Sequence, residues 1–560
     1  MSETTNARAA QEATDVAQGA TAVLLALCAG QFLMALDSSV MNVSIATVAQ
    51  DLGTTISGIQ SAIVLYTLVM AMLMITGGKI GSIIGRKRAF VIGLVIYCAG
   101  SLTTALSPTL GWLLFGWSLL EGIGAALIMP AIVALVAGNF PPVGRPRAYG
   151  LVGAAGAIAI AVGPLIGGLA TTYASWRLVF AGEVVLGIGI LLFARRMADA
   201  PVGVRPHLDL IGSVLSALGL GLAVIGVLRS SEWGWLLPAT GAPALLGMSP
   251  VFWLILGGLF SIWLFMRHIR RLEAAGAEPL VSPTLFGNRQ LTGGLLMFFF
   301  QYTVMMGIFF VIPLYLSVAL GLSAIETGIK ITPLSITMLL GAAGVPRFFP
   351  AASPRRVVET SLLAVIVGLL ILVGAMDVGA SAEIVTVPLL LIGLGMGGLA
   401  SQLGSVTVSA VPTEKSPEVG GLQNTSTQFG ASLGTALAGS VLLAALTASF
   451  LTGIAQNPAV PKELSLQASV ELAAGIPFVS DAQLESTLQQ AGLDPTTTQA
   501  VMDVNEQSRV DGLRAALALL VLIAVIALFF TRAIPQQQPS AQPEAQATVD
   551  DEPAIVPSTA

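Results

Sequence analysis

Fourteen stretches of about 20 or more mostly apolar residues, separated by shorter polar segments, run along the chain. About 20 residues in a helix span the hydrocarbon layer of a membrane, which is about 30 Å thick. The pattern therefore predicts an all-α polytopic membrane protein with fourteen transmembrane helices. We expect these helices near residues 22–45, 57–77, 89–108, 112–137, 148–171, 177–195, 208–229, 251–270, 291–318, 327–346, 357–376, 384–411, 419–450 and 512–533.

The basic residues support this number of helices. With the N-terminus in the cytoplasm, 19 of the 25 Lys and Arg residues lie on the cytoplasmic side and 6 lie outside. Cytoplasmic loops of membrane proteins carry such an excess of positive charge, and a missed helix would scramble it. We therefore expect a multi-pass protein of the cell (plasma or inner) membrane with both termini in the cytoplasm.

Composition narrows the class of protein. Of the 560 residues, 55% are hydrophobic and only 10% are charged, and the mean hydropathy is +0.86, whereas soluble proteins carry about 25% charged residues. The net charge of -5 gives no reason to expect a nucleic-acid partner. Residues 1–20 are polar, so the first apolar stretch is expected to be a retained helix and not a signal peptide.

The rare residue types exclude several kinds of chemistry. Cys28 and Cys98 lie in apolar stretches, and His207 and His268 have no metal-ligand spacing. The chain also lacks the Gly-x-x-x-x-Gly-Lys-Ser/Thr loop that binds nucleotide phosphates. We therefore expect no cofactor, no metal site and no ATP-driven pumping.

Organisation along the chain follows from the spans and from one weak duplication. The basic turn at residues 78–88 has a degraded copy at 344–356, which indicates two six-helix halves. In the long polar segment at 452–510, Ser480 and Asp494 could begin helices, so we expect a small helical hairpin on the outer side, with a disordered loop as the alternative. The predicted units are a cytoplasmic tail at 1–20, the N-terminal six-helix half at 21–200, two inserted helices at 201–275, the C-terminal six-helix half at 276–533, and a disordered cytoplasmic tail at 534–560.

Three carboxylates lie inside predicted membrane helices, namely Asp37, Glu121 and Glu183. A carboxylate in the hydrocarbon layer is costly unless it is paired, hydrated or protonated, so such residues usually serve a function. We predict that Asp37 and Glu121 gain and lose protons, and Glu183 is a third candidate. The alternatives are a structural Asp37 bonded to Ser38 or Ser39, and a packing role for Glu183.

The stretch from Gly153 to Gly168 predicts a helix built for close contact. Gly163, Gly167 and Gly168 remove side chains from one flank, so a neighbouring helix can approach closely. Pro164 removes a hydrogen bond of the helix, which a membrane tolerates only where packing satisfies the freed carbonyl.

A tight basic turn, GKIGSIIGRKR, begins at Gly78. Gly78 and Gly85 allow the sharp reversal of the chain, while Arg86, Lys87 and Arg88 hold the turn at the anionic leaflet. A purely topological role for these cations is the alternative.

The ninth predicted helix carries a dense cluster of aromatic and Met side chains between Phe298 and Phe310. Roughly half of them must pack or face lipid, because the cluster surrounds the helix. The others could line a cavity, where Met adapts to differing ligands and aromatic faces attract cations. The predicted cavity side chains, with two from later helices, are Gln301, Tyr302, Met305, Met306, Phe309, Gln402 and Asn424.

Several of these motifs resemble those of the major facilitator superfamily. Residues 159–168 (AIAVGPLIGG) resemble the fifth-helix signature of its proton-driven exporters. Residues 36–43 (LDSSVMNV) are similar to the Leu-Asp-x-Thr-x-x-Asn motif of its fourteen-helix drug:proton antiporters, and residues 78–88 resemble its gating loop. The resemblance extends from residue 36 to about residue 434.

This resemblance implies the major facilitator fold and alternating-access export of hydrophobic, including cationic, drugs in exchange for protons. It implies that the first and fourth helices line a central cavity, so Asp37 and Glu121 would be coupled across it. The sequence also departs from the family, with Ser118 at the position of a usual Arg. In the gating loop, Ser82 and Ile83 stand where Asp and Arg are usual.

Other functions remain open on the same scaffold. A dedicated exporter of one endogenous metabolite, antibiotic or lipid has the same sequence features as a multidrug exporter. A non-transporting sensor or scaffold is a further alternative, while a membrane enzyme would need a reactive cluster that we do not find. The expected partners are small hydrophobic substrates, protons and membrane lipid, and the protein is expected to be a monomer.

Overall fold

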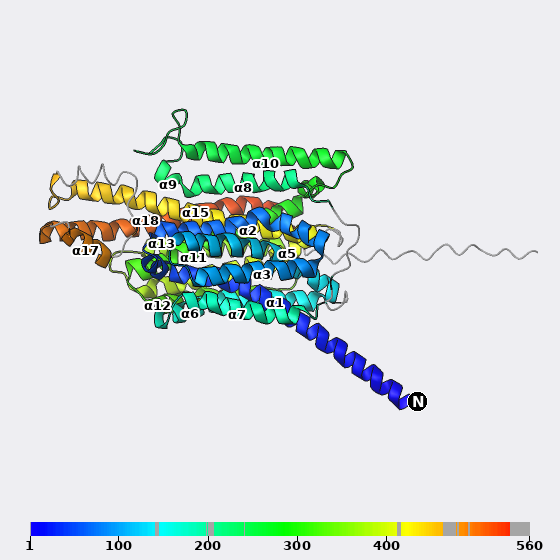
Figure 1. Cartoon of the computed structure of the whole chain (residues 1–560). Helices are drawn as coiled ribbons and strands as arrows, with labels where there is room; N and C mark the ends of the chain where they lie inside the picture. The colour runs from blue at the N-terminus through cyan, green and yellow to red at the C-terminus, as the bar shows by residue number, and fades with distance from the viewer. Residues whose placement is uncertain are drawn as a thin grey trace, which may run out of the picture.

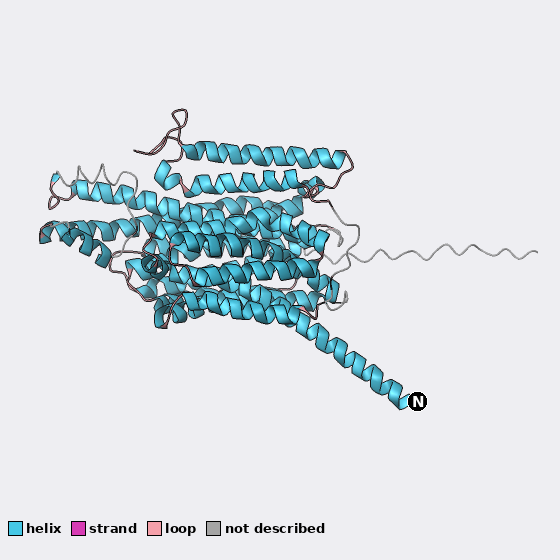
Figure 2. Cartoon of the chain, in the orientation of Figure 1, coloured by secondary structure: helices cyan, strands magenta, loops and turns pink. Residues whose placement is uncertain are grey.

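The computed structural model describes residues 2–140, 145–197, 199, 207–239, 241–411, 416–462, 478, 481–490 and 493–537. Only the backbone is described for residues 2–20, 137, 145–147, 416–417 and 481–483. Within these ranges the chain is helical almost throughout, and loops join the helices at the two ends of one bundle (Figure 2). Fourteen helices are long and apolar enough to cross a membrane, which confirms the predicted all-α fold.

The helices that form the spans run side by side (Figure 1). They are α1 (Ser2–Asp51), α2 (Ile56–Ile84), α3 (Arg86–Ala105), the continuous run of α4 (Leu110–Leu113), η1 (Leu114–Glu121) and α5 (Gly122–Asn139), α6 (Arg145–Tyr173), α7 (Arg177–Ala194), α8 (Leu210–Leu228), α10 (Pro250–Ala274), α11 (Arg289–Leu314) with η3 (Tyr315–Ala319), α12 (Ala324–Phe348), α13 (Pro354–Ala375), η4 (Ala382–Val385) with α14 (Thr386–Val408), α15 (Ser416–Gln456), and α18 (Pro495–Phe530) with η6 (Thr531–Ala533).

The bundle has two ends, which we call the N-terminal face, where α1 enters, and the opposite face. Helix α1 begins at Ser2, although its membrane span begins only at Thr21, and its first turns project from the bundle (Figure 1). At the opposite face, α15 and α18 extend past the neighbouring helices, and the short helix α17 (Asp481–Gln490) packs against α18. The carboxylate of Asp494 caps α18 by accepting hydrogen bonds from the backbone N–H groups of Thr496 and Thr497.

Parts of the predicted outer segment and tail lie outside the described residues. These are residues 463–477, 479–480 and 491–492 of the segment predicted at 452–510, and residues 538–560 of the predicted tail.

Helices α1–α7 pack against one another, as do α11–α18, and we call these two groups the halves of the bundle. Helices α8 and α10 stand together at one flank (Figure 1). Helix α8 contacts both halves, because it packs against α2 and α15. Its Val224 is buried at this contact, and the Ser440 hydroxyl of α15 donates a hydrogen bond to the Val227 carbonyl over 2.8 Å. The inserted pair is therefore attached where the halves meet.

Candidate functional site

A cavity of about 290 Å³ lies between the two halves. Helices α1, α2, α5 and α6 form one wall, and α11, α12, α14 and α15 form the other. On α1, the lining residues Gln31, Met34, Ser38 and Asn42 recur every three or four positions, so they share one face of the helix. The full lining is Gln31, Met34, Ala35, Ser38, Ser39, Asn42, Thr67, Met70, Met129, Gly153, Gly156, Ala157, Ile160, Gln301, Tyr302, Met305, Met306, Phe309, Met338, Leu339, Ala342, Ala400, Gln428 and Ala431.

The cavity residues predicted on α11 all lie in this lining, whereas the two predicted on later helices do not. Gln301, Tyr302, Met305, Met306 and Phe309 all line the cavity.

Gln402 and Asn424 are outside the lining. Gln402 is buried in α14, where its amide donates to the Ser401 hydroxyl over 3.3 Å. The carbonyl of Asn424 accepts a hydrogen bond from Thr427 within α15. Helical period alone could not have decided this, because the rotation of α14 and α15 depends on their packing.

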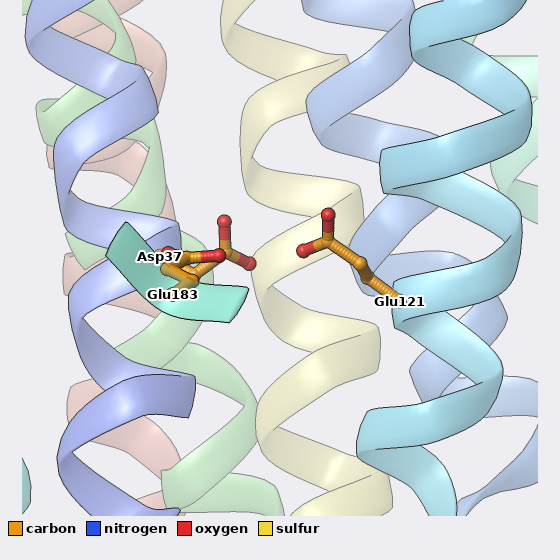
Figure 3. A group of neighbouring side chains, drawn as sticks. All are labelled: Asp37, Glu121 and Glu183. Atoms are coloured by element: carbon orange, nitrogen blue, oxygen red, sulfur yellow. The ribbon is translucent and has the colours of Figure 1, made fainter. Parts of the chain in front are cut away.

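Asp37, Glu121 and Glu183 come together in a separate cluster inside the N-terminal half, which we call the carboxylate cluster (Figure 3). One carboxylate oxygen from each residue lies within 4.8 Å of the others. The three side chains come from α1, η1 and α7, and their residues expose 1%, 0% and 2% of their surface. The spacing would also suit one small oxygen-binding cation.

Neutral donors surround the carboxylate cluster. The Trp117 indole N–H donates to Asp37 over 2.8 Å, and Thr104 donates to Glu121 over 3.2 Å. Glu183 accepts from Tyr97 over 3.1 Å and from Ser101 over 3.0 Å.

Half of the oxygens in the cluster lack a partner. One oxygen of each carboxylate is buried with no hydrogen bond, and none of the ion pairs among the described residues includes these carboxylates. Three like charges so close together would repel strongly in a medium of low dielectric constant, so the cluster must hold protons or a cation.

The π-helical segment η1 places two members of this site. A π-helix inserts an extra residue into an α-helix and often marks a functional position. Here it ends at Glu121 and carries Trp117, whose ring stacks on Tyr66 with centroids 5.1 Å apart. Ser118, at the position of the family's Arg, donates to the Ala62 carbonyl over 2.8 Å and thereby joins the fourth span to α2.

The geometry corrects one expectation, that Asp37 and Glu121 face each other across the central cavity. Neither residue lines the cavity, and both lie within the N-terminal half, behind the cavity-lining face of α1. The structure also shows no hydrogen bond from Ser38 or Ser39 to Asp37, although the structural alternative required one. Trp117 donates to one Asp37 oxygen, the other has no partner, and Ser39 donates to the Ile160 carbonyl. The sequence predicted how deep each carboxylate lies in the membrane, but not whether its side chain points into the cavity or into the helices behind it.

The contact of Ser39 with Ile160 explains how the membrane tolerates Pro164. Proline has no N–H, so the carbonyl four residues earlier, that of Ile160, loses its helical partner. The Ser39 hydroxyl of α1 lies 3.3 Å from this carbonyl and donates to it. Close packing at Gly163 makes this possible, because a Cβ there would collide with Ser39.

Helices α6 and α12 touch backbone to backbone near the opposite face. A Cβ at Gly168 would lie 2.7 Å from the Ala324 carbonyl oxygen, and one at Gly328 would collide with the Pro164 carbonyl. Toward the N-terminal face, a Cβ at Gly150 or Gly153 would touch nothing within 4 Å. The cavity is therefore closed toward the opposite face, and α6 has space beside it toward the N-terminal face.

A second contact between the halves closes the same end. The Gln60 amide of α2 donates to the Thr435 carbonyl of α15 over 3.1 Å, and Ser432 donates to the Val64 carbonyl over 3.0 Å.

Within the N-terminal half, Gly167 of α6 packs on Val40 of α1, where a Cβ would lie 3.1 Å from the Val40 Cα atom.

The basic turn between α2 and α3 is tied to its own half and, through one ion pair, to the segment after α10. The Lys79 ammonium lies 3.4 Å from the Glu278 carboxylate. Arg86 donates to the Gly78 carbonyl over 2.7 Å, and the Lys87 ammonium donates to the carbonyls of Met197 and Arg195 over 2.6 and 3.0 Å. Arg88 is exposed.

Asp199, which sequence reasoning missed, supplies a carboxylate to this turn. Its Oδ1 accepts the Lys87 backbone N–H over 3.0 Å, and its Oδ2 lies against Gly85, whose φ is +103°. The turn therefore has an acidic partner from the segment after α7, although Ser82 stands at the usual Asp position.

Gly85→Ala is expected to destabilise the protein, because a side chain at this φ costs about 1–3 kcal/mol and its Cβ would also collide with Asp199. Gly276→Ala is the matched control, since Gly276 also has a positive φ, +72°, but has nothing within 4 Å of an added Cβ. Thermal unfolding in detergent should show a larger decrease for Gly85→Ala, and Asp199→Ala should recover part of it. Equal decreases in the two glycine variants would mean that the contact with Asp199 has no effect.

The fold and the site define a membrane transporter with a central cavity between two helical halves. The sequence profile of the Major Facilitator Superfamily matches residues 27–435, and the chain belongs to that family. It is thus a transporter of small molecules and not an enzyme, as the sequence predicted.

Three relatives illustrate the similarity. The chain is 28% identical to a probable actinorhodin transporter of Streptomyces coelicolor, over 76% of this chain and 73% of that protein. It is 29% identical to a puromycin resistance protein of Streptomyces alboniger, over 78% of this chain and 84% of the relative. It is 24% identical to the multidrug resistance protein Stp of Mycobacterium tuberculosis, over 90% of each chain.

The fold itself matches solved transporters. A bacterial homologue of the human lysosomal transporter Spinster, in an inward-facing and unoccupied conformation, superposes with a TM-score of 0.58 over 92% of this chain and 98% of that chain. At 16% sequence identity this match establishes the shared fold alone.

Proposed function

We propose that this transporter exports hydrophobic drugs or antibiotics from the cytoplasm in exchange for protons. Its relatives in Streptomyces and Mycobacterium are named as antibiotic transporters and drug resistance proteins, which supports export of such compounds. The observation that carries the proton exchange is the carboxylate cluster, which is buried, has no cationic partner among the described residues, and lies directly behind the cavity wall.

The distribution of charge supports the direction of transport that we propose. The topology predicted from the sequence puts 19 of the 25 Lys and Arg residues on the side of the N-terminal face, and by the positive-inside rule this side is then the cytoplasm. A cavity closed at the opposite face then represents the state that takes up substrate from the cytoplasm.

The carboxylate cluster and the cavity share helix α1 but no side chain. Asp37 belongs to the cluster, while Ser38 and Asn42 line the cavity. Protons and substrate therefore oppose each other through the conformation each favours, and not by competing for one carboxylate. Protons entering from outside favour the return of the transporter to the cytoplasm-facing state, and their release inside resets the cluster.

Proton movement in proteoliposomes tests this proposal. Two hydrophobic probes, the phenol genistein and the cation tetraphenylphosphonium, are added to vesicles that contain a pH-sensitive dye. We expect at least one probe to cause a proton flux that protein-free vesicles lack. If neither probe nor any related hydrophobic compound moves protons, the exchange mechanism is wrong.

A dedicated exporter of one antibiotic is the second candidate. It is favoured by the relatives whose names specify a single compound, such as the cephamycin export protein of Amycolatopsis lactamdurans, at 29% identity. The cavity of about 290 Å³ lies near the lower limit of roughly 300–1,000 Å³ for small-molecule sites. Transport of one compound and exclusion of unrelated drugs of similar size would support this candidate.

A further inference from the structure

The described wall of the central cavity carries no carboxylate, amine, guanidinium or imidazole group. None of its described lining residues is Asp, Glu, Lys, Arg or His. The polar side chains in it are amides and hydroxyls, and the lining also includes six Met side chains and the aromatic rings of Tyr302 and Phe309.

The acids of the carboxylate cluster cannot form an ion pair in direct contact with a ligand in this cavity, because none of them lines it. Asp37 lies on another side of α1 from Ser38 and Asn42, where Trp117 donates to it. Glu121 and Glu183 belong to the same carboxylate cluster (Figure 3), and neither lines the cavity.

A permanent cation in the cavity would therefore be poorly compensated. Removing an ion from water without a partner costs several kcal/mol even after relaxation. Cation–π contact with an aromatic face returns part of this cost. Tyr302 and Phe309 are the aromatic residues of the described lining, so we expect desolvation to outweigh the attraction.

Two amides of the lining have an unused hydrogen-bond acceptor. Asn42 donates to the Ser38 carbonyl over 2.7 Å, and Gln301 donates to the Met396 carbonyl over 3.2 Å. The side-chain oxygen of each is buried and has no hydrogen-bond partner. A buried acceptor without a partner is costly, so a ligand that brings a donor to it gains free energy on binding.

We propose that the cavity selects uncharged aromatic molecules that present hydroxyl or N–H donors to Asn42 and Gln301. Met sulfur and aromatic side chains make favourable contacts with aromatic rings, which matches this class of substrate. The proposal rests on the proposed export function and assigns its substrate class. Asn42 and Gln301, one from each half, would then determine specificity, and a bound substrate would bridge the halves.

Binding of three probes to the purified protein tests the substrate class. Genistein is an uncharged aromatic with hydroxyl donors at mildly acidic pH, its fully O-methylated analogue lacks the donors, and tetraphenylphosphonium is a permanent cation. We expect genistein to bind about 10-fold or more tightly than its methylated analogue, and no saturable binding of the cation, because each lost hydrogen bond costs about 1–1.5 kcal/mol. Saturable binding of tetraphenylphosphonium at the same or higher affinity than genistein would overturn the proposal.

Variants of Gln301 distinguish recognition through its side-chain oxygen from non-specific hydrophobic binding. Gln301→Met should weaken genistein binding about 10-fold and leave binding of the methylated analogue unchanged, since only genistein donates to the lost oxygen. Gln301→Glu places a carboxylate in the cavity and should create binding of tetraphenylphosphonium. Gln402→Met is the matched control, because Gln402 is buried outside the cavity lining.

Failure of this proposal can be told apart from failure of proton exchange. Counterflow, in which labelled substrate exchanges across a vesicle without a proton gradient, measures recognition alone. Genistein counterflow without proton movement would leave the substrate class standing and overturn the antiport. Proton movement driven by tetraphenylphosphonium but not by genistein would support the antiport and overturn the proposed substrate class.

Discussion

Asp37→Asn is expected to abolish proton-driven export while leaving exchange of substrate across the membrane. The substitution keeps the shape of the side chain and its contact with Trp117 but removes the site of one exchangeable proton. Coupling between two ligands of one protein typically amounts to 1–3 kcal/mol, or about 5–150-fold. We expect the concentration ratio that proton-driven transport builds across the membrane to decrease by a factor toward the upper end of that range.

The measurement compares two assays in the same vesicles. Uphill transport driven by a pH gradient should be lost in Asp37→Asn, whereas counterflow of genistein should continue at a similar rate. Asp503→Asn is the matched control, because Asp503 is an exposed carboxylate on α18 far along the chain from the cluster.

The other two carboxylates should behave as members of one unit. Because one oxygen of each lies within 4.8 Å of the others, Glu121→Gln and Glu183→Gln should each impair uphill transport, and the double variant should be little worse than either single variant. Additive losses would indicate separate proton sites.

For Asp37→Asn, loss of counterflow in a normally folded protein would contradict the separation of the proton site from the substrate site.

The number and place of the membrane helices could be predicted because they depend on the length of each apolar stretch. Likewise Asp37 could be singled out by its rarity in such a stretch. What could not be predicted was the direction in which each side chain points. Adjacent residues of a helix are rotated by about 100°, so Ser38 lines the cavity while Asp37 lies in the carboxylate cluster.

Glu183 shows why the depth of a residue in the membrane does not by itself predict its role. Its position in the sixth span did not distinguish a packing residue from a functional one, and only the packing of α3 and α7 brings it to Tyr97, Ser101 and the other two acids. Asp199 was missed for a different reason. It lies between spans, where no hydrophobic period gives its position, and its partner Lys87 is 112 residues away along the chain.

The glycines of α6 gave a stronger signal, since their spacing predicted a close helix contact. The sequence did not indicate that the partner of Gly163 and Gly167 is α1 whereas that of Gly168 is α12. These partners belong to different halves. One short motif thus fixes α6 inside its own half and also closes the cavity against the other half.

Gly168→Val is expected to shift the transporter away from the state described here. A Cβ at Gly168 would lie 2.7 Å from the Ala324 carbonyl oxygen and 2.8 Å from the Ile325 Cα atom, so two backbones would have to separate. Overpacking of this kind costs about 1–3 kcal/mol. The population closed at the opposite face should then decrease about 5–150-fold relative to states in which α6 and α12 are apart.

Accessibility of the cavity measures this shift directly. In a chain with Cys28→Ser and Cys98→Ser, Ser38→Cys places a single thiol in the cavity lining. A membrane-impermeant maleimide added outside the vesicle should label this thiol slowly in the parent chain and faster when Gly168→Val is added. Transport should decrease in parallel, because alternating access requires both states.

Gly150→Val provides the matched control on the same helix. It adds the same side chain to α6, but nothing lies within 4 Å of a Cβ at Gly150 in this state. Any general effect of valine on the helix is common to both variants, so only Gly168→Val should increase labelling from outside. Equal labelling in the two variants would mean that the contact of Gly168 with Ala324 does not hold the cavity closed, and the closure would then have to reside in the α2–α15 contact of Gln60 with Thr435.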